Sequence, residues 1–256
     1  MTRFKGLCLA LLALTCSAEP PGHLAIAAAA DLQFALTEVK TAFAKTQPGL
    51  EVAITYGSSG NFYTQLTNKA PFDLFLSADL DYPKKLVAAG QADGTTAFRY
   101  SRGRLVLWVP KHSPIPLEQL GMRALLHPAA RKVAIANPRH APYGKAAEAA
   151  LRNLGLLEAV TPRLVFGENI GQTAQFVQTG AADIGILALS LAKAPPLAAT
   201  GRTYDVPRGA YPPLDQGGVI PNHARNRAAA LAFRDFLRSP EGLAILRRYG
   251  FTTEAP

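Results

Sequence analysis

Four short stretches of small and polar residues are the places where this sequence could do chemistry. They are residues 28–31 (Ala-Ala-Ala-Asp), 57–60 (Gly-Ser-Ser-Gly), 137–144 (Asn-Pro-Arg-His-Ala-Pro-Tyr-Gly) and 167–171 (Gly-Glu-Asn-Ile-Gly). Each follows an apolar run and opens an amphipathic segment, which predicts a strand-to-helix junction. A helix N-terminus presents unpaired backbone N–H groups and a partial positive charge. Several of them converging would bind an anion without lysine or arginine side chains.

Each junction also has a purely structural interpretation. Asp31 and Asn169 fit helix N-caps that accept a backbone N–H from the first turn, and Pro142 fits the first helical turn itself. Gly-Ser-Ser-Gly alone is typical of a turn, and Tyr143 alone is typical of packing. The binding interpretation is favoured because the junctions occupy corresponding places in two series of strands and helices.

The two series follow from apolar runs that alternate with amphipathic segments, a pattern typical of parallel α/β construction. The first predicts strands over residues 24–29, 50–56 and 72–76, with helices from about 32, after 60 and over 79–89. The second predicts strands over 133–136, 163–166 and 184–187, with helices over 143–154 and 170–179. A final strand over 217–220 and helices over 224–237 and 241–249 follow, while 111–117 and 194–201 are expected to be loops.

This order predicts two lobes between which the chain crosses twice, near residues 102–105 and 211–217. Residues 22–104 and 212–256 would form the first lobe, and residues 105–211 the second. The anion site would lie between the lobes, at the carboxyl ends of the strands. A single larger sheet is also compatible with the pattern.

The first 18 residues have the features of a secretory signal peptide. A basic start is followed by an apolar run over residues 6–14 and by small residues up to Ala18, near which we expect cleavage. The alternative is a lipoprotein anchored through Cys16. Both cysteines, Cys8 and Cys16, lie in this segment, so the exported chain is expected to have neither disulfides nor thiolate metal ligands.

Charge and motifs argue against several functional classes. The formal net charge is +9, or +7 without Arg3 and Lys5, but the basic residues are scattered, so nucleic-acid binding is not expected. The five histidines lack metal-ligand spacing, and there is no Gly-x-Ser-x-Gly elbow or Walker loop. The nearby carboxylates Asp73, Asp79 and Asp81 fit helix capping better than acid–base catalysis. We therefore expect no enzymatic activity.

Taken in order, these stretches make the sequence resemble the periplasmic molybdate-binding proteins of ABC importers, the ModA family. The resemblance covers nearly all of the chain after residue 18. It is carried by residues 28–32, 57–61, 70–79, 103–108, 136–144 and 180–185. It implies the α/β, two-lobed periplasmic-binding-protein fold, in which each lobe has a mostly parallel sheet flanked by helices and the ligand binds in the cleft between lobes.

The resemblance also implies a function and a set of contacts. The protein would capture molybdate or tungstate in the periplasm and deliver it to the membrane permease of an ABC importer. It would act as a monomer without a cofactor, and its molybdenum would be bound as the oxyanion rather than through direct protein–cation ligands. The implied contacts come from the Ala30–Asp31 turn, Ser58 and Ser59 in the first lobe, and from Tyr143 and the Ile170 N–H in the second.

Two departures from the family pattern bear on selectivity. Many members have Ser, Thr or Asn where this chain has Ala30-Asp31, and a tyrosine where it has Leu187-Ala188, so Tyr143 would supply that hydroxyl instead. If Asp31 caps its helix, the site offers donors only and suits a fully deprotonated dianion. If Asp31 faces the cleft, protonated phosphate becomes a candidate. A sulfate or phosphate carrier is thus one alternative, and a two-lobed periplasmic enzyme is another.

Overall fold

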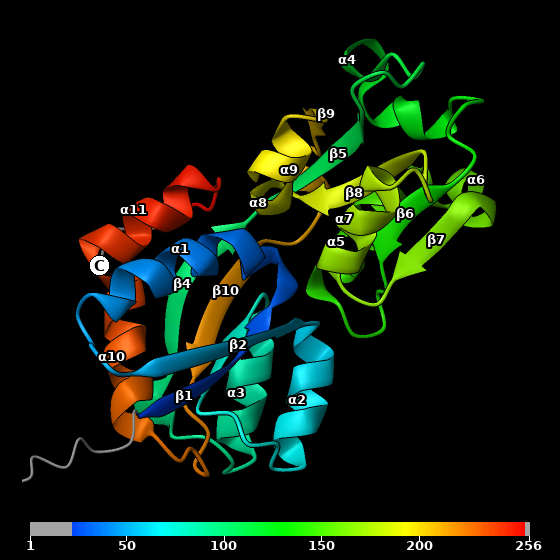
Figure 1. Cartoon of the computed structure of the whole chain (residues 1–256). Coiled ribbons are helices and arrows are strands. Elements are labelled where there is room, and N and C mark those ends of the chain that lie inside the picture. The colour runs from blue at the N-terminus through cyan, green and yellow to red at the C-terminus, as the bar shows by residue number, and fades with distance from the viewer. Residues whose placement is uncertain (1–21, 254–256) are drawn as a thin grey trace, which may run out of the picture.

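The computed structural model describes residues 22–253, so the predicted signal segment and its cleavage near Ala18 lie outside the described residues. Figure 1 shows two lobes, each built on one sheet with helices packed around it. The strand order is β2-β1-β3-β10-β4 in the first lobe and β7-β6-β8-β5-β9 in the second. The alternative of a single larger sheet is therefore wrong.

The strands of the first sheet are β1 (His23–Ala29), β2 (Glu51–Gly57), β3 (Leu74–Ser77), β4 (Phe98–Gly103) and β10 (Leu214–Val219). Those of the second are β5 (Leu105–Pro110), β6 (Val133–Ala136), β7 (Leu164–Gly167), β8 (Ile184–Ala188) and β9 (Gly201–Asp205). In each sheet, three neighbouring parallel strands are followed by one antiparallel strand, β10 or β5. The predicted mostly parallel α/β fold is confirmed.

The helices of the first lobe are α1 (Gln33–Ala44), α2 (Ser59–Thr67), α3 (Asp81–Ala88), α10 (Arg227–Arg238) and α11 (Pro240–Arg248). Those of the second are α4 (Leu117–Leu120), α5 (Pro142–Asn153), α6 (Leu157–Val160), α7 (Ile170–Gln178), α8 (Leu189–Ala192) and α9 (Pro195–Ala198). Short 3₁₀ helices are η1 (Ala30–Leu32), η2 (Gly94–Thr96), η3 (Gly121–Leu126), η4 (Thr161–Arg163) and η5 (Arg208–Ala210). None of the helices within residues 22–253 has the length and apolar character of a membrane span.

The chain passes between the two sheets twice. β4 ends at Gly103 and β5 begins at Leu105, and the chain returns between Asp205 and Leu214. The last two helices then pack on the first lobe beside α1, as Figure 1 shows in red and orange. Phe43 of α1 and Phe233 of α10 meet there edge to face, with ring centroids 5.0 Å apart. The C-terminal segment thereby completes the core behind β1.

Two local predictions are corrected by the structure. The region predicted as a loop over 194–201 contains the short helix α9, and β9, which was not predicted, pairs with β5 at the sheet edge. β9 (Gly-Arg-Thr-Tyr-Asp) has no buried residue, so its sequence lacks the apolar alternation that indicates a strand. The last strand also begins at Leu214 rather than 217, because its first half is polar.

Candidate functional site

A small pocket lies between the lobes, where the four predicted junctions meet. The first lobe contributes Ala29, Ala30, Asp31, Gly57, Ser58, Ser59 and Ala78, and the second contributes Ala141, Pro142, Tyr143 and Ile170. All six residues predicted from the sequence as contacts are therefore brought to one pocket. Its size and its lining of small residues suit an ion of a few atoms rather than an extended organic ligand.

Strand register explains why the junctions converge. β1 and β2 are parallel, with Ala29 opposite Gly57, so their carboxyl ends lie side by side. β6 and β7 are parallel in the same way, with Ala136 opposite Gly167. Since each of these strands is followed by a helix, two helix starts from each lobe are presented to the cleft.

Side-chain caps fix the first turns of two of these helices, α2 and α7. Ser58 Oγ accepts the Asn61 N–H of α2, and Asn169 Oδ1 accepts the Gln172 N–H of α7 at 3.0 Å. The Ser59 Oγ accepts the Ala78 N–H at 3.0 Å, which leaves the hydroxyl proton of Ser59 available to a ligand. The pocket is thus lined by the Ser58 and Ser59 hydroxyls and by the first residue of α7, Ile170.

Asp31 does not cap a helix, and that prediction is wrong. Asp31 is 1% exposed, and its Oδ2 accepts hydrogen bonds from Gln216 Nε2 at 2.6 Å and from Tyr143 Oη at 2.9 Å. Neither η1 nor α1 has a side-chain cap. Within the described residues, Asp31 Oδ1 has no hydrogen-bond partner. Burial raises the pKa of Asp31 to about 6, although the bonds from Gln216 and Tyr143 oppose that rise.

Tyr143 connects the second lobe to this carboxylate. It is buried, and its hydroxyl donates to Asp31 and accepts from Gln216 Nε2 at 3.1 Å. Burial and the adjacent Asp31 raise the pKa of Tyr143 well above its ordinary value, so the hydroxyl keeps its proton at neutral pH. Gly103 permits this packing, because a Cβ there would lie 2.1 Å from Tyr143 Oη.

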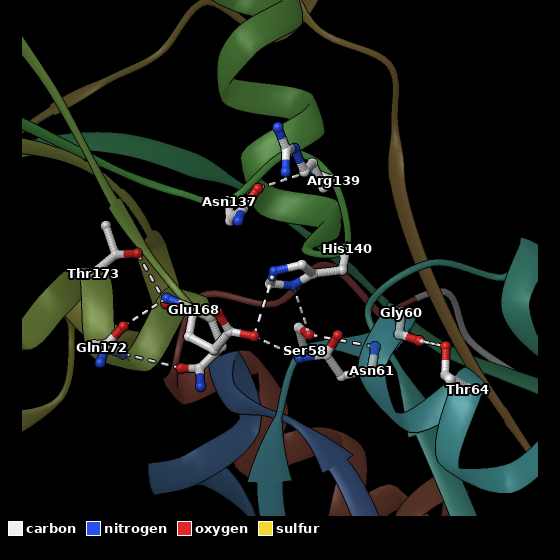
Figure 2. Close-up of polar contacts among 11 residues, drawn as sticks. Ser58, Gly60, Asn61, Thr64, Asn137, Arg139, His140, Glu168, Gln172 and Thr173 are labelled. Carbon is white, nitrogen blue, oxygen red and sulfur yellow. Dashed lines mark hydrogen bonds and ion pairs between the residues drawn. The ribbon is translucent and has the colours of Figure 1, made fainter. Parts of the chain in front are cut away.

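Direct contacts between the lobes surround the pocket, as Figure 2 shows for the rim formed by α2 and the loops before α5 and α7. The Gly60 N–H donates to the His140 carbonyl at 2.9 Å, and His140 Nδ1 lies 3.0 Å from Ser58 Oγ. Asn61 Nδ2 donates to Glu168 Oε1 at 2.7 Å, and His140 Nε2 lies 3.4 Å from the same oxygen. The two lobes are therefore closed on each other at the pocket.

Two carboxylates outside the pocket, Asp73 and Asp79, accept hydrogen bonds from backbone N–H groups. Asp73 accepts the N–H groups of Ala25, Arg225 and Asn226. Asp79 Oδ1 accepts the Asp81 N–H at 2.9 Å, at the start of α3. Among residues 22–253, no group of three or more His, Cys, Asp or Glu side chains is placed to bind a metal ion.

The fold agrees with comparisons to known proteins. Residues 24–252 match the model of a family described as bacterial extracellular solute-binding protein. This chain belongs to that family. The molybdate-binding protein ModA of Rhodobacter capsulatus is 39% identical to this solute-binding protein over 233 residues, which cover 91% of this chain and 89% of the relative. ModA of Azotobacter vinelandii is 36% identical over 93% of this chain and 92% of its own length.

A solved structure supports the same assignment. The periplasmic molybdate-binding protein of Azotobacter vinelandii superposes on this solute-binding protein with a TM-score of 0.83 at 34% identity, covering 90% of this chain and 99% of the other. The substrate-binding domain of a molybdenum ABC transporter from Clostridium difficile gives a TM-score of 0.67 at 26% identity, covering 91% and 99%.

Sequence reasoning missed two residues that hold Asp31 in place in this solute-binding protein. Gln216 reaches the pocket cluster from β10, 185 positions from Asp31, and is fully buried. Ser190 of α8 donates to the Asp31 carbonyl at 2.7 Å. A polar residue within a strand or in a short helix has no local pattern that distinguishes it from a surface residue. Only the tertiary structure identifies them, because it brings β10 and α8 to Asp31.

Proposed function

We propose that this protein captures molybdate or tungstate outside the cytoplasm and delivers the anion to the membrane permease of an ABC importer. The observation that carries the proposal is the convergence of four strand-to-helix junctions, two from each lobe, on one small pocket. The names of the similar proteins support the choice of molybdate. Backbone and hydroxyl donors bind an oxyanion without a basic side chain.

The proposed contacts come from both lobes, so that binding joins them. The Ala30–Asp31 turn, Ser58 and Ser59 would contact the anion from the first lobe, which we assign to residues 22–104 and 212–256. Tyr143 and the Ile170 N–H would contact it from the second lobe, residues 105–211. Because each set lines only part of the pocket, the bound anion favours the closed arrangement of the lobes.

The proposal also covers the location of the protein, its assembly and its lack of catalysis. The protein acts in the periplasm as a monomer after cleavage near Ala18. It needs no resident cofactor, binds no nucleic acid, and serves transport rather than catalysis. Its molybdenum is cargo and is held as an oxyanion through its oxygens.

Calorimetric titration of the anion-free protein with molybdate, tungstate, sulfate and phosphate tests the function. We expect molybdate and tungstate to bind at one site with higher affinity than sulfate, because the larger tetrahedral ions place their oxygens farther from the central atom. Binding of phosphate but not of molybdate would overturn the proposed ligand.

Replacement of Ser59 by alanine should weaken molybdate binding by about 1.5–3 kcal/mol, roughly ten- to more than hundredfold, since one hydrogen bond to a charged group is lost. Ser113→Ala is the matched control, because the Ser113 hydroxyl accepts the Ile115 N–H in the second lobe, outside the pocket lining. Thermal unfolding of the anion-free variants separates a binding effect from a folding effect. An unchanged affinity in Ser59→Ala would show that Ser59 is only a turn residue.

A further inference from the structure

Among the described residues that line the pocket, Asp31 is the only one with a carboxyl group, which is negatively charged when it is ionised. The other lining residues are alanine, glycine, serine, proline, isoleucine and Tyr143, whose hydroxyl keeps its proton. A carboxylate and a dianion in one small buried pocket repel each other strongly, because little water screens them. A pocket that binds a dianion must therefore avoid repulsion from an ionised Asp31.

The two carboxylate oxygens of Asp31 are in different environments. Oδ2 accepts both hydrogen bonds, from Gln216 and Tyr143, and so has the environment of a carbonyl oxygen. Oδ1 is buried and has no partner among the described residues. This asymmetry suits a neutral carboxylic acid whose proton is on Oδ1. The Asp31 backbone N–H is a third donor that lowers the pKa of the carboxyl, and none of the three donors is charged.

The elements packed around Asp31 supply no counter-charge. α7 and α8, which pack against η1, have no titratable side chain. On α1, Glu38 bonds to Tyr249 and Arg248, and on β10, Asp215 bonds to Arg99 and Arg102.

Tyr143 of α5 and Tyr100 of β4 are buried phenols whose pKa values are raised well above the ordinary value. His140 and Glu168 lie at the rim, and Lys145 donates to Tyr82 Oη.

We propose that Asp31 binds the anion as a neutral carboxylic acid, with its Oδ1–H donating to an anion oxygen while Oδ2 accepts from Gln216 and Tyr143. This inference rests on the proposed function. Capture of a fully deprotonated dianion then takes up one proton from solvent. The Asp31 carboxylic acid takes the place of the Ser, Thr or Asn donor that the family pattern has at this turn. The protonated side chain makes the pocket donor-only and so selects against anions that must themselves donate a proton.

The pKa of about 6 for Asp31 agrees with this arrangement. At pH 7 about a tenth of the free protein would already hold the proton. The need to protonate Asp31 therefore lowers the observed anion affinity only about tenfold at this pH. Above pH 6 the observed affinity should fall by about tenfold per pH unit, because the fraction of protonated Asp31 falls by that factor. Below that pKa the affinity should become constant.

The test is molybdate titration of the wild-type protein between about pH 6 and 8, in buffers with different ionisation enthalpies, which counts the protons exchanged. We expect uptake of close to one proton at about pH 8. The Asp31→Asn variant keeps a donor in the Oδ1 position through its amide. It should bind molybdate without proton uptake, with an affinity that does not change over this pH range and exceeds the wild-type affinity at about pH 8. Asp235→Asn, on the exposed face of α10, should behave as wild type.

Two outcomes would contradict these proposals in different ways. Molybdate binding without proton uptake in the wild-type protein would overturn the role of Asp31 and leave the proposed function standing. Binding of phosphate but not molybdate, lost in Asp31→Asn, would overturn the proposed function, because the anion would then bring the proton and Asp31 would accept it.

Discussion

Replacement of Gly60 by alanine should weaken molybdate binding by at least about tenfold, or about 1.4 kcal/mol, without destabilising the anion-free protein. A Cβ at Gly60 would lie 2.6 Å from the carbonyl oxygen and 2.9 Å from the Cα of His140, which are backbone atoms of the opposite lobe. Backbone atoms cannot move aside as a flexible side chain does, so the closed arrangement is hindered. The same Cβ would also meet the end of the Tyr82 side chain, which can rotate away.

The effect on folding should have the opposite sign. Gly60 lies in the first turn of α2, and alanine is more favourable than glycine within a helix by up to about 1 kcal/mol. Calorimetry with molybdate and urea unfolding without it measure the two effects separately. Gly209→Ala is the matched control, because a Cβ at that glycine meets nothing within 4 Å. If Gly60→Ala bound molybdate normally, the bound protein would not bring His140 against α2.

Replacement of Phe233 by alanine should lower the free energy of unfolding by about 3–5 kcal/mol, the range for loss of a large buried aromatic side chain. Phe233 is completely buried and packs edge to face on Phe43 of α1. Its removal leaves a cavity between the C-terminal helices and the helix that follows the Asp31 turn. Urea unfolding followed by circular dichroism measures the change.

Phe166→Ala is the control for this substitution. Phe166 lies on β7 and is 50% exposed, so its loss should change stability by less than about 1 kcal/mol. Similar effects of the two substitutions would show that α10 does not contribute to the core of the first lobe as the structure indicates.

Much of the site was predictable from sequence because its elements are locally encoded. The junctions at Gly57-Ser58-Ser59-Gly60 and Gly167 to Gly171 combine a strand ending, a capping side chain and a helix start within a few residues. Ser58 and Asn169 do cap α2 and α7, as their residue types indicate. The parallel pairing of β1 with β2 and of β6 with β7 then places the strand ends within each lobe side by side.

Asp31 shows where local reasoning failed. A carboxylate beside the start of a helix is typical of a cap, and nothing within a few residues argues otherwise. Its actual partners, Tyr143 and Gln216, come from the second lobe and from the strand that returns after it. The hydrogen bonds of a buried polar group depend on which distant segments surround it.

By itself, the sequence determined the alternation of strands and helices and the capped helix starts, since these depend on residue types within one or two turns. Only the tertiary structure decided that Asp31 faces Tyr143 and Gln216, that β9 completes the second sheet, and that His140 meets Gly60 across the cleft. Those features arise between segments far apart in the chain, where burial and the closing of the lobes, rather than local preference, set the contacts.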